Sequence, residues 1–278
     1  MIRSSKRKLF AIILIPFFVV NLWSETTVSS SMNWQTGRFS LTAARTLGEG
    51  AAPDDHPREL SLLEREITPY LAEQLGNLPW DYRGSLKDLT SRNPSTRTSL
   101  ENLAGSLEKE WSRLSEDYTA VEAQYFVDLG DRLAQYFPPE SNQTFPEPPI
   151  GWTPTPRDGW TGIVVYVPEV LPLRGTGLMV EAKPALRARI LSDELEVLYD
   201  PGSRGSSMMT YLPMEDRTNA EDITGRRPYR TMARGVYGEF PCDIIISQED
   251  RDRIMATESG RRSLAEGRIV VLMDRLPN

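Results

Sequence analysis

The sequence has very little cysteine and histidine, with one of each, Cys242 and His56, in 278 residues. A single cysteine excludes an intramolecular disulfide. A structural zinc site is excluded as well, because it needs several cysteine or histidine ligands. No cysteine closes the apolar run near the N-terminus, so an acceptor for lipidation is missing there. We therefore expect an ordinary hydrophobic core, no metal and no cofactor.

Motifs of catalysis are missing too. No G-x-S-x-G sequence accompanies His56, and the glycines do not follow the spacing of dinucleotide- or phosphate-binding loops. Carboxylates do gather after a predicted strand and at the start of a predicted helix; they are Asp128, Asp131, Glu249, Asp250 and Asp252. At a helix start, capping is the simpler role. We predict no catalytic residue and a non-enzymatic protein, with a carboxylate hydrolase as a less favoured alternative.

Long hydrophobic runs are also scarce, and the longest lies close to the N-terminus. Residues 9–23 (LFAIILIPFFVVNLW) follow Arg3, Lys6, Arg7 and Lys8 and precede Ser24. This order of basic, apolar and small residues is typical of a secretory signal peptide. Fifteen residues of helix would span roughly 22 Å, short of a ~30 Å hydrocarbon core. We therefore predict a signal peptide over 1–24 and export to the periplasm or envelope, with an uncleaved membrane anchor as the alternative.

Acidic residues dominate the remainder of the chain. Without the four cations of the leader, 28 Lys and Arg stand against 39 Asp and Glu. Such a surface repels nucleic acid and anionic lipid head groups. We therefore expect no nucleic-acid partner, and membrane contact only through a retained leader.

What is present predicts an α+β fold in two regions. Residues 25–136 contain predicted helices at 59–75 and 95–118, with Pro69 kinking or dividing the first, and strands near 33–43 and 119–129. Residues 137–156 are rich in proline and predict a linker. Residues 157–278 predict a mixed sheet with one or two helices, the first capped by Ser247. Six strands are predicted, at 161–167, 185–190, 194–199, 229–236, 243–247 and 268–274.

Two tryptophans mark the end of the proline-rich segment and are the candidate interaction residues. Trp152 and Trp160 can stack on a sugar or on a partner peptide. More often, such side chains hold a linker against its domain. A glycan- or peptidoglycan-binding module is therefore an alternative function.

The second region resembles a known family through an ordered set of segments. They are WTGIVVY at 160–166, PALRARI at 184–190, EVLY at 196–199, ARGVYG at 233–238, DIIIS at 243–247 and GRIVVLMD at 267–274. This order resembles small exported proteins of diderm bacteria related to the flagellar proteins FlgP and FlgT. Their acid and base in "DARGL" are absent here, where 167–171 reads VPEVL. The resemblance implies a structural or assembly component of the envelope, self-associating or docked to a flagellar-type assembly.

Overall fold

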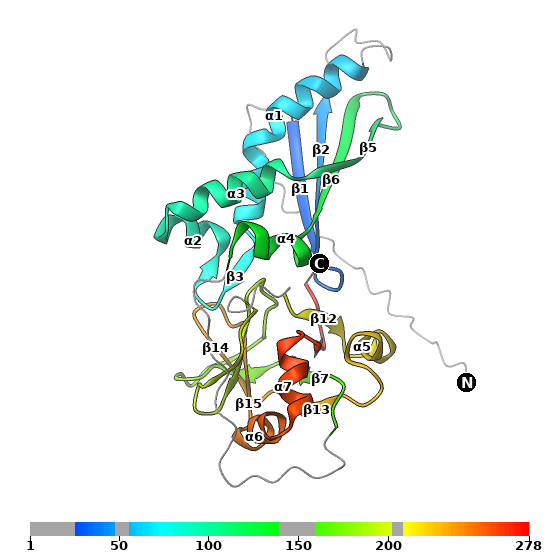
Figure 1. Cartoon of the computed structure of the whole chain (residues 1–278). Coiled ribbons are helices and arrows are strands. Elements are labelled where there is room, and N and C mark those ends of the chain that lie inside the picture. Colours follow the sequence, from blue (N-terminus) through cyan, green and yellow to red (C-terminus); the bar gives the residue numbers. More distant parts are fainter. Residues whose placement is uncertain (1–25, 48–55, 139–158, 202–207, 278) are drawn as a thin grey trace, which may run out of the picture.

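The computed structural model describes residues 26–47, 56–138, 159–201 and 208–277. The predicted leader, most of the predicted linker and Trp152 lie outside these ranges. The described chain is α+β, as the sequence predicts. Figure 1 shows the first region, coloured blue to green, above the second, which ends in red, with the C-terminus between them. Among the described residues, no helix is long and apolar enough to span a membrane.

The first region is built on a four-stranded antiparallel sheet in the order β1-β2-β6-β5. Its central strands are β2 (Arg38–Thr46) and β6 (Ala120–Asp128), and its edges are β1 (Thr26–Asn33) and β5 (Glu108–Leu114). Burial alternates along β2 and β6, because successive side chains point to opposite faces. The predicted strand at 119–129 is confirmed, and the predicted hairpin turns between Asn33 and Arg38.

Helices cover one face of this sheet. The helix α1 (His56–Gly76) packs on β1, β2 and β6 and buries Leu63, Ile67 and Leu75, so the prediction at 59–75 is confirmed. Pro69 does not divide it. Three shorter helices follow, namely α2 (Leu86–Arg92), α3 (Ser95–Gly105) and α4 (Leu129–Tyr136).

The prediction of one helix over 95–118 is wrong. The helix α3 ends at Gly105, and β5 pairs with β6 from Glu108 onward. Trp111 and Leu114 lie three residues apart and so imitate a helical face. In β5, however, Trp111 lies opposite Gln124 and Leu114 lies opposite the buried Val121, on the two different faces of the sheet. The ladder with β6 decides between the two structures.

The second region contains a four-stranded parallel sheet in the order β12-β16-β7-β13. Its strands are β7 (Ile163–Val167), β12 (Thr210–Pro213), β13 (Tyr229–Met232) and β16 (Ile269–Met273). The continuous apolar runs of β7 and β16 are buried on both faces, as predicted. Val164, Val270 and Leu272 pack with α5 (Arg217–Thr224), while the alternate residues join the main core with α7 (Glu258–Ala265).

A second, mixed sheet has the order β11-β10-β15-β14. It contains β10 (Ile190–Ser192), β11 (Val197–Tyr199), β14 (Gly235–Tyr237) and β15 (Asp243–Ile246), and a small hairpin, β8 (Leu171–Pro172) with β9 (Met179–Val180), lies beside it. Ser247 caps α6 (Gln248–Ala256), as predicted, accepting a hydrogen bond from the Asp250 amide. The predicted strand at 229–236 is wrong as one strand, because β13 and β14 belong to different sheets. The strand predicted at 185–190 forms only from Ile190.

The two regions share one hydrophobic core. Buried side chains of the antiparallel sheet and of both C-terminal sheets belong to the same cluster. A short hairpin, β3 (Pro79–Asp81) with β4 (Gly84–Ser85), extends from the first region toward the second. This junction hairpin organises the candidate site.

Candidate functional site

The backbone of the junction hairpin bonds directly to the second region. The amides of Leu186 and Arg187 donate to the carbonyls of Pro79 and Trp80 at 3.0 and 2.7 Å. The Phe240 amide donates to the Tyr82 carbonyl at 3.1 Å. These hydrogen bonds pair backbone donors of the second region with backbone acceptors of the first, so the polar groups of the hairpin can be buried at the junction.

Arginine side chains of the second region stack on the hairpin's rings. Arg187 lies 4.6 Å from the buried Trp80 ring, and Arg189 lies 4.3 Å from the Tyr82 ring. Arg189 also makes a two-nitrogen contact to the fully buried Asp243, at 2.9 and 2.5 Å. Burial raises the pKa of Asp243, and the Arg189 guanidinium partly offsets that effect. Removing Arg189 would therefore leave an uncompensated buried carboxylate.

A second contact forms at the β1–β2 turn. The ring of Trp34 meets that of Tyr211 in β12 edge to face, with centroids 5.8 Å apart and planes at 81°. The buried Tyr211 hydroxyl donates to the Ala185 carbonyl at 3.1 Å and accepts from the Ala185 amide at 3.3 Å. Burial is the main cause that raises the pKa of this phenol well above its usual range. Tyr211 therefore holds the turn through its ring and the loop before β10 through its hydroxyl.

Between these two contacts lies a cleft of about 620 Å³, which we call the junction cleft. Met32, Leu78, Phe240 and Leu276 give it apolar walls. Its volume and composition are those of sites that take a small molecule or a short peptide segment.

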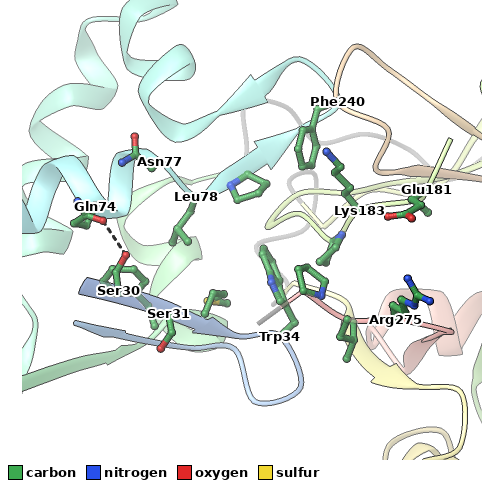
Figure 2. A pocket seen from close by; sticks show the side chains of 17 residues that line it. Ser30, Ser31, Trp34, Gln74, Asn77, Leu78, Glu181, Lys183, Phe240 and Arg275 are labelled. Atoms are coloured by element: carbon green, nitrogen blue, oxygen red, sulfur yellow. Dashed lines mark hydrogen bonds between the residues drawn. The ribbon is translucent and has the colours of Figure 1, made fainter. Parts of the chain in front are cut away.

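Polar groups lie at opposite sides of the junction cleft (Figure 2). Ser30 and Gln74 face each other across one side, with the Ser30 hydroxyl donating to Gln74 Oε1 at 2.8 Å. Glu181, Lys183 and Arg275 lie on the other side. Lys183 leans over the Phe240 ring, with its Nζ 5.5 Å from the centroid. The arrangement can bind an apolar segment and orient one charged group.

Of the two predicted interaction residues, Trp160 lies at the surface of the core. Its ring meets Tyr229 edge to face at 5.1 Å and 70°, and its Nε1 is buried without a hydrogen-bond partner. Its amide donates to the Ser259 hydroxyl at 3.1 Å. Part of the half-buried ring is therefore used in packing against the core. Trp152 lies outside the described residues.

The carboxylates singled out from the sequence are engaged in local structure. Asp250 accepts hydrogen bonds from the hydroxyls of Ser247, Tyr229 and Thr231 at 2.5, 2.6 and 2.9 Å. Burial opposes its charged form, but these donors outweigh burial and lower its pKa.

The neighbouring acids bind arginines. Glu249 pairs with Arg253, and Asp252 pairs with the buried Arg251 at 2.8 Å. Asp128 lies 3.6 Å from Arg38 at the end of β6, and only the backbone of Asp131 is described. Within the described ranges, no cluster of His, Cys, Asp or Glu has the composition of a metal site.

His56 and Cys242, the two rare residues, lie apart from these acids. His56 is the first residue of α1, and Cys242 is buried beside Asp243. Burial is the main cause that raises the pKa of the Cys242 thiol, so it stays protonated near neutral pH.

The residues of the junction cleft escaped sequence analysis. Trp34, Lys183 and Phe240 belong to different segments of the chain, and none lies in a motif.

The fold and the junction define a two-domain α+β protein with a cleft between its domains. Residues 25–136 match the family model described as Treponema pallidum Tp0624, N-terminal domain, and residues 162–275 match the one described as Treponema pallidum Tp0624, second domain. The chain therefore carries two domains of the Tp0624 family, a spirochaete protein family. Neither match links it to FlgP or FlgT. No curated protein matches the chain.

Proposed function

We propose that this chain is an exported, non-enzymatic protein of the periplasm or envelope that acts as a structural or assembly component. It works through protein contacts, and its junction cleft receives an extended segment of a partner envelope protein. The observation that carries this proposal is the edge strand β1, which has no charged residue or proline and forms one wall of the cleft.

The two edges of the antiparallel sheet differ in their protection. The edge strand β5 carries Glu108, Lys109, Glu110 and Arg113 and has a register shift between Lys109 and Trp111. Charges and bulges of this kind block the addition of further strands. The edge strand β1 reads TTVSSSMN, without charge or proline, and keeps a regular register over eight pairs with β2. It retains the features that permit strand addition.

The unprotected edge and the cleft are continuous. Ser30, Ser31 and Met32 belong to β1 and line the junction cleft. A segment added beside β1 would place alternate side chains against the apolar walls, while Lys183 favours an acidic group at the rim. Backbone hydrogen bonds supply affinity in this mode, and the pockets supply specificity.

Cross-linking in native cell envelopes tests the proposal. Since Cys242 is buried, a Ser31→Cys variant carries one accessible thiol among the described residues. A thiol-specific photo-cross-linker attached there should give a discrete adduct with an envelope protein. The matched Glu110→Cys control on β5 should give none. Recovery of monomer alone from both variants would contradict the proposal.

Export has its own test. Mass measurement of the protein from envelopes should find an N-terminus close to Glu25. An intact Met1 would contradict cleavage of the leader and favour the retained anchor. The resemblance in the sequence further implies docking to a flagellar-type assembly. In that case the Ser31→Cys adduct should contain a flagellar chain, and an adduct with any other envelope protein would contradict it.

The alternatives have less support. A glycan-binding role through Trp152 and Trp160 would need an exposed indole face, whereas Trp160 packs against Tyr229. A carboxylate hydrolase would need two acids in one concave site, whereas Asp250 is engaged by three hydroxyl donors.

A further inference from the structure

A second cleft at the junction, of about 840 Å³, is distinct in its charge. It lies between the β3–β4 hairpin with α2 on one side and the β8–β9 hairpin with the end of β14 on the other. Three guanidinium groups line it, those of Arg83, Arg92 and Arg174. We call it the arginine cleft.

These guanidinium groups have few anionic partners of their own. Arg83 donates to the Tyr82 hydroxyl at 2.8 Å, and Arg174 donates to the Asp193 carbonyl at 2.9 Å. Neither forms an ion pair with another described residue. Arg92 forms a long ion pair with Asp81, at 4.0 Å, and donates to the Asp88 carbonyl at 3.1 Å. By contrast, twelve other arginines of the described chain form ion pairs; they are Arg38, Arg45, Arg97, Arg113, Arg132, Arg189, Arg230, Arg251, Arg253, Arg262, Arg268 and Arg275. The arginine cleft thus concentrates positive charge in an acidic protein.

Two carboxylates of the arginine cleft offset part of this charge. Asp88 accepts hydrogen bonds from the Ser85 amide and hydroxyl at 2.8 and 2.7 Å, which lowers its pKa and engages it in capping α2. Glu239 is exposed at the end of β14. Three arginines against these two carboxylates leave the lining of the arginine cleft with an excess of one positive charge.

Aromatic rings complete the arginine cleft. Tyr82 and Tyr237 are half-buried, with centroids 5.7 Å apart and planes tilted by 37°. Arg189 and Arg83 already lie over the Tyr82 ring, at 4.3 and 4.9 Å, and Arg83 donates to its hydroxyl. Tyr237 is therefore the ring that offers an apolar face to the C–H groups of a sugar. The volume is within the range of small-ligand sites.

We propose that the arginine cleft binds an anionic saccharide, a sugar bearing a carboxylate or a phosphate. Arg83 and Arg174 pair with the anion, because the guanidinium fork matches both groups. Tyr237 contacts the ring of the sugar, and Tyr82 holds Arg83 beside it. Since both domains contribute, bound ligand spans the junction. This activity is independent of strand addition to β1.

Titration of the full-length protein with matched sugars tests the proposal. N-acetylmuramic acid is compared with N-acetylglucosamine, which lacks its carboxylate, and glucose 6-phosphate is compared with glucose. We expect at least one charged sugar to bind about tenfold or more tightly than its neutral counterpart, because charge-assisted hydrogen bonds are lost in the latter. The pair that shows the difference identifies the anion as carboxylate or phosphate.

Variants that remove a positive charge from the cleft are compared with one that removes a negative charge. Arg174→Gln and Arg83→Gln should each weaken binding about tenfold, while Glu239→Gln should strengthen it, because a repelling carboxylate is removed. Arg97→Gln is the matched control, since Arg97 is an exposed arginine outside the cleft that pairs with Glu101. Thermal melts of the free proteins verify that all four variants fold.

Three results would overturn the proposal. One is equal affinity for charged and neutral sugars, and another is equal weakening by Arg97→Gln and Arg174→Gln. The third is binding of inorganic phosphate as tight as that of glucose 6-phosphate, because contact between Tyr237 and the sugar ring would then add nothing to the affinity.

Discussion

At the scale of single residues, Gly238 allows the junction hairpin to dock. Its φ is +115°, and a Cβ there would lie 2.5 Å from Tyr82 Cβ and 2.7 Å from the Tyr82 carbonyl oxygen. Gly238→Ala combines a strained φ with a clash against backbone, so we expect a loss of about 2 kcal/mol or more in unfolding free energy. Urea denaturation measures it.

Gly175→Ala is the control for this substitution. Gly175 has φ +82°, but nothing lies within 4 Å of its added Cβ. The Gly175→Ala variant should lose only about 1 kcal/mol of unfolding free energy, the cost of a positive φ at alanine. Equal losses in the two variants would contradict the role of close approach at Gly238.

The lowered pKa of Asp250 predicts that the unfolding free energy depends on pH. Its pKa is lower in the folded chain than in the unfolded one, so the unfolded state binds the proton more readily. Its stabilising contribution is complete above the ordinary Asp value, about pH 4, and is lost as pH falls through the lowered folded pKa. Asp250→Asn should cost about 1–3 kcal/mol at pH 7, and the difference from the parent should shrink below pH 4.

Denaturant titrations at a series of pH values check this expectation. The control is Glu249→Gln, because Glu249 is exposed and forms an ion pair with Arg253 on the same helix. It should change stability by a few tenths of a kcal/mol at every pH. A difference for Asp250→Asn that stays constant down to pH 2 would refute the linkage.

At the scale of elements, the junction hairpin couples the two domains through Trp80. This side chain is 2% exposed and contacts the Phe137 ring at 5.0 Å and the Arg187 guanidinium at 4.6 Å. Trp80→Ala should cost about 3–5 kcal/mol, because it leaves a cavity in the shared core. Calorimetry should show the transition of the parent resolving into two.

Trp111→Ala provides the comparison within the same region. Trp111 is half-buried on the face of the antiparallel sheet away from α1, beneath Arg113 at 4.8 Å. Its loss should cost about 1–2 kcal/mol and leave the transition single. A single transition in Trp80→Ala would show that the hairpin does not couple the domains.

Local sequence patterns predicted the helices and strands well where a single buried face sets the spacing of the apolar residues. The apolar positions of α1 repeat at three and four residues, and those of β6 repeat at two, so period alone assigns both. The cap at Ser247 is local as well. Periodicity gives the wrong assignment after Gly105, because Trp111 and Leu114 have helical spacing but lie on opposite faces of β5. Only the neighbouring β6 resolves that ambiguity.

At the scale of the whole molecule, the shared core predicts that the domains stay together after the chain between them is cut. A specific protease site inserted after Pro148 allows one defined cleavage. We expect both fragments to co-elute in gel filtration, because backbone bonds and rings of the junction hairpin persist. The same cleavage in Trp80→Ala should release separate fragments. Separation of the cleaved parent would instead support two independent domains joined only by the predicted linker at 137–156.

The sequence by itself determined the α+β class, the helix α1, the buried strands β7, β15 and β16, and the cap at Ser247. These depend on interactions between residues within a few positions of one another. The candidate site depended on the tertiary structure. Trp34, Lys183 and Phe240 of the junction cleft lie far apart in the chain, as do Tyr82 and Arg174 of the arginine cleft. The folded backbone brings them together, and the shared core offsets the conformational entropy lost in holding them there.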